Sequence, residues 1–318
     1  MTKPIILRAA KLPAATLAEL EHLFTVLHLP EDKADVLAFL KQHGASVRGL
    51  ALRKTVVDQT MLEALPALEI IASYSAGLDN VDLDAVRARG IQVRNSSQIL
   101  ARDVANTAMA LLLAVTRDIV SADAFVRDGS WARGNTFPLG RSIVGMKVGV
   151  VGLGAIGSEV ALRLQALGAV VAYTGPRPKA VDLAFHATVH ELAEVSDALV
   201  LTCPLTNATH HAVDAAVLQA LGPRGYLINI SRGPVVDEEA LIGALAQGRI
   251  AGAGLDVFEL EPAVPQELIE DPRVILTPHI GSGTEETRQA MADNVVEALA
   301  DHFQLRPLRQ EDAVRGLD

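Results

Sequence analysis

The chain has a single cysteine, few aromatic side chains and fewer basic than acidic residues. Cys203 is the only cysteine in 318 residues, which excludes an intrachain disulfide framework and any metal site built from several cysteines. Aromatic residues make up 3% of the chain, so aliphatic side chains must fill the core. The chain has 28 Lys and Arg against 38 Asp and Glu, a net charge of −10. With no basic run to offset this charge, we expect neither a nucleic acid nor an anionic membrane as partner.

Long hydrophobic runs are missing as well. The longest stretch without a charged side chain, residues 198–213, is too short to span a membrane and is interrupted by Pro204. At the N-terminus only the run 4–7 precedes Arg8, so the apolar core of a secretory signal is absent. The expectation is a protein of the reducing cytoplasm.

What the chain does contain is a repeated alternation of short apolar runs and amphipathic segments, over a length that corresponds to about two domains. In the first 95 residues, strands are predicted at 4–9, 26–29, 46–52, 69–73 and 91–95. Helices are predicted between them at 16–27, 33–42, 61–65 and 82–89. Gly44 and Gly90 follow two of these helices, where a left-handed residue is often needed. Such alternation predicts a parallel sheet covered by helices.

A second alternating series begins at Lys147, after a long helical pattern at 103–128 and a loop rich in glycine. Its predicted strands are 148–151, 169–174, 198–202, 225–230, 251–257 and 274–277, and a last helix is predicted at about 285–303. The fold class that follows is α/β, with two doubly wound parallel-sheet domains.

Gly152, Gly154 and Gly157 form a G-x-G-x-x-G turn between an apolar strand and an amphipathic helix. In this setting backbone amides and the helix N-terminus, here opened by Ala155 and Ile156, receive a pyrophosphate. The third glycine permits close packing of helix and strand. Ordinary tight turns also use glycine, but the strand–turn–helix context favours a dinucleotide site.

The end of the following strand points to NADPH as the cofactor. A site that prefers NAD usually has a carboxylate about 20 residues beyond the second glycine, where it accepts a hydrogen bond from the ribose 2′-hydroxyl. Here the strand ends at Thr174 and is followed by Gly-Pro-Arg-Pro-Lys, without an acid. A 2′-phosphate is attracted by a guanidinium such as that of Arg177. The alternative, in which Arg177 and Lys179 are solvated loop charges, stays open.

Three chemically useful residues follow three of the predicted strands: Arg232, Glu261 and His279. All three leave the sheet at the edge that carries the glycine turn, where ligands of open α/β sheets bind. Taken singly, each could be an incidental loop residue. Together they supply an anion clamp, a proton donor and a carboxylate that orients the donor, which is the set required to reduce a carbonyl beside a carboxylate.

Several runs give the sequence a resemblance to a known family: Cys-Pro-Leu-Thr at 203–206, Arg-Gly-Pro-Val-Val-Asp-Glu at 232–238, Gly-Leu-Asp-Val-Phe at 254–258 and Thr-Pro-His at 277–279. With the glycine turn, they resemble the D-isomer-specific 2-hydroxyacid dehydrogenases from about residue 73 to 303. The segments 74–79 and 173–177 are most similar to the NADPH-dependent glyoxylate/hydroxypyruvate and hydroxyphenylpyruvate reductases. The resemblance implies a Rossmann cofactor domain, 99–285, inserted into a flavodoxin-like substrate domain, 1–98 plus 286–318, and a homodimer.

The resemblance also implies roles by position. Arg232, Glu261 and His279 fall on the catalytic residues, with His279 as the proton donor paired to Glu261 and Arg232 binding the substrate carboxylate. Substrate binding is also implied for Ser75, Ala76, Gly77 and Leu78, and no metal is expected. The implied cofactor contacts are Gly152, Gly154, Ala155, Ile156, Gly157, Thr174, Arg177, Cys203, Pro204, Thr209, Ile230, Ser231, Asp256 and Gly281. The implied reaction is NADPH-dependent reduction of a small 2-oxo acid, such as glyoxylate or hydroxypyruvate, to the D-2-hydroxy acid.

Alternative interpretations remain at this point. A formate-type dehydrogenase of the same scaffold lacks the glutamate partner of its histidine, so Glu261 argues against it. A dinucleotide-sensing, corepressor-like module on this fold would bind the cofactor without turnover, and hydroxyphenylpyruvate is an alternative substrate. Cys203 ends a strand without an evident base and is expected to pack rather than to react. Trp131 could cap a substrate pocket, even that of a neighbouring subunit, or anchor its own loop.

Overall fold

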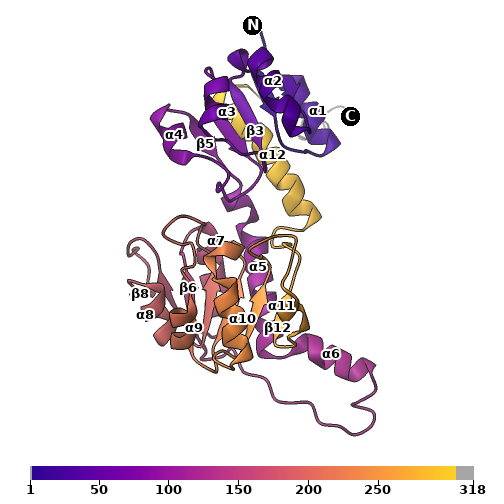
Figure 1. Cartoon of the computed structure of the whole chain (residues 1–318), viewed down its shortest axis with the longest axis vertical. Helices are drawn as coiled ribbons and strands as arrows, with labels where there is room; N and C mark the ends of the chain where they lie inside the picture. The colour runs from indigo at the N-terminus through magenta and orange to yellow at the C-terminus, as the bar shows by residue number, and fades with distance from the viewer. Residues whose placement is uncertain (1, 306–318) are drawn as a thin grey trace, which may run out of the picture. The chain divides into compact units, whose positions relative to one another are not determined.

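The computed structural model describes residues 2–305, and the chain forms two compact units (Figure 1). Unit 1 contains the described residues of Met1–Leu100 and Glu285–Asp318, and unit 2 is Ala101–Thr284. Helix α5 (Ser97–Thr116) leads from unit 1 into unit 2, and the chain returns with α12 (Glu285–His302). The domain boundaries expected at 98 and 286 lie beside these crossings. The part of the expected substrate domain beyond residue 305 lies outside the described residues.

Unit 1 is built on a five-stranded parallel sheet in the order β2-β1-β3-β4-β5, which is the flavodoxin-like doubly wound order. Its strands are β1 (Ile5–Arg8), β2 (Thr25–His28), β3 (Gly49–Leu52), β4 (Ile70–Ser73) and β5 (Gln92–Arg94). Besides α12, the helices are α1 (Ala14–Leu23), α2 (Lys33–His43), α3 (Gln59–Ala64) and α4 (Leu83–Ala88), with a 3₁₀ turn η1 (Gly44–Ser46). The central strands β3 and β4 are buried along their whole length, which is why they read as continuous apolar runs.

Two predictions for unit 1 are wrong in detail. The first helix ends at Leu23 rather than 27, because Phe24 is extended and the chain enters β2 directly. Gly44 has a right-handed φ of −67°, since a 3₁₀ turn continues the helix there. Its glycine is required by packing instead: a Cβ atom at Gly44 would lie 2.2 Å from the carbonyl oxygen of Ala64. Gly90 does have the predicted left-handed conformation, with φ +68°.

Unit 2 is built on a seven-stranded parallel sheet in the order β12-β11-β10-β9-β6-β7-β8, a Rossmann order extended by one strand. Its strands are β6 (Lys147–Val151), β7 (Val170–Thr174), β8 (Ala184–His186), β9 (Ala198–Leu201), β10 (Tyr226–Asn229), β11 (Gly252–Leu255) and β12 (Val274–Leu276). Its helices are α6 (Ile119–Arg127), α7 (Ala155–Ala166), α8 (Val189–Glu194), α9 (Ala215–Leu221), α10 (Glu238–Ala246) and α11 (Gln266–Glu270), with a 3₁₀ turn η2 (Gly233–Val235). The two doubly wound parallel sheets confirm the predicted fold class. The three-residue strand β8, at the sheet edge, was not predicted.

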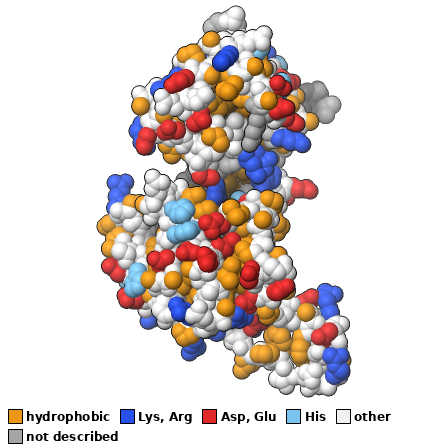
Figure 2. Space-filling view, viewed as in Figure 1, with side chains coloured by type: hydrophobic (Ala, Val, Ile, Leu, Met, Phe, Trp, Pro, Cys, Tyr) orange, Lys and Arg blue, Asp and Glu red, His pale blue; other side chains and the backbone are white. Residues whose placement is uncertain are grey.

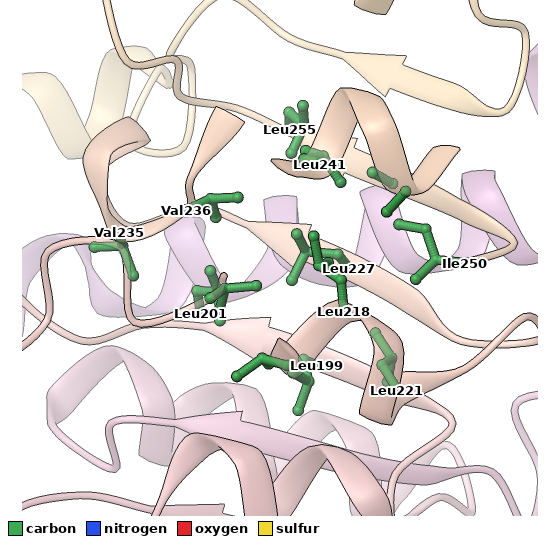
Figure 3. Close-up of a cluster of buried hydrophobic side chains, with 14 of the residues drawn as sticks. Leu199, Leu201, Leu218, Leu221, Leu227, Val235, Val236, Leu241, Ile250 and Leu255 are labelled. Carbon is green, nitrogen blue, oxygen red and sulfur yellow. The ribbon is translucent and has the colours of Figure 1, made fainter. Parts of the chain in front are cut away.

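Aliphatic side chains form the core of unit 2, as the scarcity of aromatics predicts (Figure 3). Leu199 and Leu227 point from neighbouring strands β9 and β10 towards the helices that cover this part of the sheet. Leu218 of α9 and Leu241 of α10 belong to the same buried cluster. This packing fixes β9, β10 and β11 against one another, and the carboxyl ends of these strands carry most of the candidate site.

The helical pattern predicted at 103–128 is two helices in the structure. Helix α5 ends at Thr116 and α6 begins at Ile119, because Asp118 adopts a left-handed conformation with φ +51°. Among residues 2–305, α5 is the one helix that is long and apolar enough to cross a membrane by length and composition. It packs against β11 instead: Cβ atoms at Gly252 and Gly254 would lie 2.9 Å from side-chain atoms of α5. Its apolar residues therefore belong to the core of unit 2.

Asp197 joins the beginnings of two neighbouring strands in unit 2. Its carboxylate accepts hydrogen bonds from the amide of Lys147 at 2.9 Å and from Nη2 of Arg141 at 3.0 Å. Partial burial by itself would raise the pKa of Asp197, but the amide and the guanidinium outweigh it, and the pKa lies below its ordinary value.

We predict that Asp197→Ala lowers the free energy of unfolding by about 1–3 kcal/mol at neutral pH, because two donors lose their acceptor. Since the folded-state pKa is the lower one, this contribution is complete above the ordinary aspartate pKa of about 4 and is lost as pH falls through the folded-state value. Urea unfolding at neutral and acidic pH measures this: the free energies of unfolding of wild type and variant should become more similar as the pH falls. Asp182→Ala, at an exposed loop aspartate, is the control. An equal loss at both pH values would contradict the assignment.

Candidate active site

The glycine turn follows β6 and has the geometry of a phosphate cradle. Gly152 has φ +96°, and a Cβ atom at Gly157 would lie 2.0 Å from the carbonyl oxygen of Gly152. Gly154 caps the N-terminus of α7, and a Cβ atom there would meet nothing within 4 Å. Among the described residues, the amides of Ala155 and Ile156 have no acceptor. The turn thus offers open space lined by N–H donors, which fits the pyrophosphate of a dinucleotide.

The neighbouring strands hold this turn in place at the point where the strand order reverses, between β6 and β9. The carbonyl of Thr174 accepts a hydrogen bond from the Gly152 amide at 2.9 Å. The hydroxyl of Thr202 donates to the Gly152 carbonyl at 2.5 Å. Thr202 was not among the predicted residues, although it directly follows β9.

The segment after β9 contains three predicted cofactor residues. Cys203 is buried, and its backbone lies within 2.9 Å of the position that a Cβ atom would take on Gly152. Burial raises the pKa of the Cys203 thiol to about 11, so the thiol is protonated at neutral pH and packs rather than reacts. The hydroxyl of Thr209 donates to the Pro204 carbonyl at 2.6 Å and closes the loop.

The loop after β7 carries two cations and no carboxylate in the stretch 175–179. Arg177 is exposed between two prolines. The amide of Lys179 donates to the Tyr173 hydroxyl at 2.7 Å, and its ammonium group donates to the carbonyl of Leu153 within the glycine turn. Lys179 therefore folds the loop back onto the turn, a contact that the sequence pattern did not predict.

Arg232, Glu261 and His279 follow the adjacent strands β10, β11 and β12. Nδ1 of His279 lies 2.9 Å from Oε2 and 3.1 Å from Oε1 of Glu261. The His279 side chain is 46% exposed, and its Nε2 has no partner among the described residues. An imidazole held by a carboxylate on one nitrogen and open on the other can donate a proton to a bound ligand.

Asp256 supports the turn that carries His279. It is only 1% exposed, and its carboxylate accepts hydrogen bonds from the Thr277 hydroxyl at 2.7 Å and from the amides of Ile280 and Gly281 at 2.8 Å. The His279 amide donates to the Asp256 carbonyl at 2.9 Å, and His279 adopts φ +54°. The Asp256 side chain, implied by the resemblance to contact the cofactor, thus already holds the loop after β12.

Arg232 emerges from the buried end of β10, where Ile230 and Ser231 are covered. The Arg232 amide donates to the Ser231 hydroxyl at 2.6 Å, and Nη1 donates to the Ser231 carbonyl at 2.8 Å. The next residue, Gly233, lies directly on another segment of backbone: its Cβ atom would be 2.0 Å from the carbonyl group of Phe258. The segments that carry Arg232 and Glu261 are therefore in direct backbone contact.

The predicted substrate loop, residues 75–78, follows β4 in unit 1. Its carbonyl groups accept hydrogen bonds from the Ser96 amide at 3.3 Å, Nδ2 of Asn95 at 2.8 Å and the Val81 amide at 3.0 Å. The Ser75 amide donates to a neighbouring hydroxyl, but the amides at 76, 77 and 78 have no acceptor within the described part of the chain. Consecutive unsatisfied amides of this kind suit a carboxylate. Within residues 2–305, no group of three or more His, Cys, Asp or Glu side chains could hold a metal ion.

Comparisons with known proteins identify relatives of the chain. Residues 109–281 match the family model described as D-isomer specific 2-hydroxyacid dehydrogenase, NAD binding domain. A hydroxyphenylpyruvate reductase of Plectranthus scutellarioides is 46% identical over 272 residues, covering 85% of this chain and 87% of that protein. A glyoxylate/hydroxypyruvate reductase A of Arabidopsis thaliana is 44% identical over 290 residues, covering 90% and 91%. An NADPH-dependent glyoxylate/hydroxypyruvate reductase of Sinorhizobium meliloti, in complex with NADP and malonate, matches with a TM-score of 0.86 and 41% identity over 96% of both chains.

Proposed function

Because the chain belongs to the D-isomer-specific 2-hydroxyacid dehydrogenase family and is an oxidoreductase, we propose that it reduces a small 2-oxo acid to the D-2-hydroxy acid with NADPH. Glyoxylate and hydroxypyruvate are the proposed substrates, as the names of the relatives suggest. The observation that carries the proposal is the pair of His279 and Glu261, at the edge of the sheet that also bears the glycine turn.

In the proposed reduction, separate groups of residues bind the cofactor, bind the substrate and donate the proton. NADPH supplies the hydride when it is bound, and the glycine turn holds its pyrophosphate. Arg232 binds the substrate carboxylate and also polarises the carbonyl. In unit 1, the amides of 76–78 are proposed as donors to a carboxylate. Protonated His279 donates from Nε2 to the oxygen that becomes the hydroxyl. Glu261 orients the ring through Nδ1.

A screen for NADPH oxidation over 2-oxo acids of increasing size tests the proposal. Glyoxylate and hydroxypyruvate are expected to be turned over. 4-Hydroxyphenylpyruvate belongs in the screen because the relative from Plectranthus scutellarioides bears that name and is 46% identical. Binding of NADPH without turnover of any 2-oxo acid would favour a dinucleotide-sensing module instead.

We predict that His279→Ala lowers kcat by about 10²- to 10⁴-fold, because a general acid is lost. The dissociation constant for NADPH should change little, since His279 lies outside the glycine turn. Steady-state kinetics and a fluorescence titration with NADPH measure the two quantities. His190→Ala, which removes an exposed histidine of α8, should behave as wild type. Retained turnover in His279→Ala would reject the assignment.

The preference for NADPH over NADH is proposed from the loop after β7, where Arg177 is exposed and no carboxylate is present. Removing one charge-assisted contact costs about 1.5–3 kcal/mol, so Arg177→Ala should lower the NADPH/NADH ratio of kcat/KM by about 10- to 150-fold. Arg249→Ala, an exposed arginine elsewhere in unit 2, serves as the control. A wild-type enzyme that is more efficient with NADH would contradict the preference.

We further propose a homodimer formed through an arm of unit 2, which consists of α6 and the loop that leads to β6. In Figure 1 this arm extends away from the sheet, and Figure 2 shows hydrophobic side chains gathered on it. Its exposed apolar residues are Ile119, Val120, Val126, Trp131, Leu139 and Val144. Leu139 is 99% and Trp131 68% exposed, which favours a contact of Trp131 with a neighbouring subunit over a role in anchoring its own loop. An apolar surface of this kind suits a second copy of the chain.

The wild-type protein is predicted to sediment as a dimer in analytical ultracentrifugation. The double variant Val120→Glu, Leu139→Glu should sediment as a monomer, because two charges would be buried in the interface. Leu162→Glu places the same charge on an exposed leucine of α7, outside the arm, and should leave the dimer intact. A monomeric wild type, or a double variant that remains dimeric, would be evidence against the proposed interface.

We also propose that the protein works in the cytoplasm without a nucleic-acid or membrane partner. The single cysteine suits a reducing compartment, and the net charge of −10 disfavours polyanions. Subcellular fractionation with an antibody against the native protein tests the location.

A further inference from the structure

A second group of ionisable side chains lies next to the catalytic pair and has no task in the reaction described above. We call Glu238, Glu259 and His211 the Glu238 cluster. Oε1 of Glu238, the first residue of α10, accepts a hydrogen bond from the Glu259 amide at 3.2 Å. Oε1 of Glu259 lies 3.2 Å from Nε2 of His211. Glu259 precedes Glu261 by two residues. The cluster therefore contacts the segment that carries Glu261, the hydrogen-bond partner of His279.

This segment, residues 258–261, is held from more than one side. The backbone of Gly233 packs on its first peptide group, where a Cβ atom would lie 2.0 Å from the Phe258 carbonyl carbon and 2.3 Å from the Glu259 nitrogen. The Phe258 amide donates to Oε1 of Glu261 at 3.3 Å. The Glu238 carboxylate, by accepting a hydrogen bond from the Glu259 amide, adds a side-chain contact to the same peptide group on which Gly233 packs.

Glu238 is partly buried and lies beside a second carboxylate, that of Glu259. Burial raises the pKa of Glu238, the hydrogen bond from the Glu259 amide opposes this, and the Glu259 carboxylate raises the pKa further. Two neighbouring carboxylates repel each other, and Nε2 of His211 lies 3.2 Å from Oε1 of Glu259, within hydrogen-bonding distance. His211 is itself fixed, because its amide donates to the Pro234 carbonyl at 2.8 Å.

We propose that Glu238 is a positioning residue for the reduction: by accepting the Glu259 amide, it holds segment 258–261 so that Glu261 stays on Nδ1 of His279. The inference rests on the proposed roles of Glu261 and His279. Without the Glu238 acceptor the segment shifts, and the protonated imidazole loses part of its stabilisation. Among the described ionisable groups, Glu259 faces Glu238, with His211 and the stacked ring of His210 behind it, and Glu261 faces His279.

The experiment compares Glu238→Ala, Glu238→Gln and Glu239→Ala. Because the reduction requires protonated His279, Glu238→Ala should move the alkaline limb of the kcat profile with glyoxylate to lower pH by about one unit, which lowers kcat about ten-fold at pH values above the wild-type limb. KM for NADPH should stay unchanged. Glu238→Gln keeps an acceptor oxygen and should retain the wild-type limb. Glu239→Ala removes an exposed carboxylate from the same turn of α10 and should match wild type.

A second measurement does not depend on turnover. The NMR titration midpoint of the His279 imidazole, assigned by its absence in His279→Ala, should fall in Glu238→Ala and stay in place in Glu238→Gln. If neither the NMR midpoint of His279 nor the alkaline limb of the kcat profile shifts in Glu238→Ala, the inference is overturned. It is also overturned if Glu238→Gln behaves like Glu238→Ala. A wild-type protein without turnover, in which the midpoint still falls in Glu238→Ala, would contradict the proposed function and support the positioning role.

Discussion

The hydrogen bond between Nδ1 of His279 and the Glu261 carboxylate is the interaction on which the proposed chemistry depends. An imidazole can donate from Nε2 in a fixed direction only if its other nitrogen is held. The sheet provides this arrangement, because β11 and β12 are parallel neighbours and the residues that follow them meet at one edge. Asp256 stabilises the arrangement, because its carboxylate accepts hydrogen bonds from amides of the turn that carries His279. If any of these contacts were lost, His279 and Glu261 would still be present in the chain but would no longer be paired.

Close backbone contacts made possible by glycine support both halves of the candidate site in unit 2. Gly157 lets α7 approach the Gly152 carbonyl, beside the amides of Ala155 and Ile156 that are proposed to receive a cofactor phosphate. Gly233 lets the backbone beside Arg232 lie on the segment that leads to Glu261. In both places any side chain would collide with main-chain atoms, which cannot rotate away. The constraint is therefore steric, and it acts on the positions of functional groups that are distant in sequence.

Much of the fold follows from local patterns, since strands buried on both faces read as apolar runs and β3, β4, β9 and β10 are of this kind. The catalytic candidates could be proposed because Arg232, Glu261 and His279 lie in the segments that follow three neighbouring strands, β10, β11 and β12. Contacts between distant segments left no local signal: Lys179 reaches Leu153, and Glu238 binds the amide of Glu259. The left-handed conformation predicted for Gly44 is wrong, because a glycine after a helix is usually left-handed, whereas here the chain continues into a 3₁₀ turn.

In the proposed reaction, this chain moves a hydride to the second carbon of a 2-oxo acid and a proton to its oxygen. Incubation with hydroxypyruvate and NADPH in which both hydrogens at C4 are deuterium, followed by mass spectrometry and chiral separation of the product, tests this reaction directly. We predict D-glycerate with a single deuterium at C2, formed in a molar amount equal to that of the NADP released. L-glycerate, or product without deuterium, would contradict it.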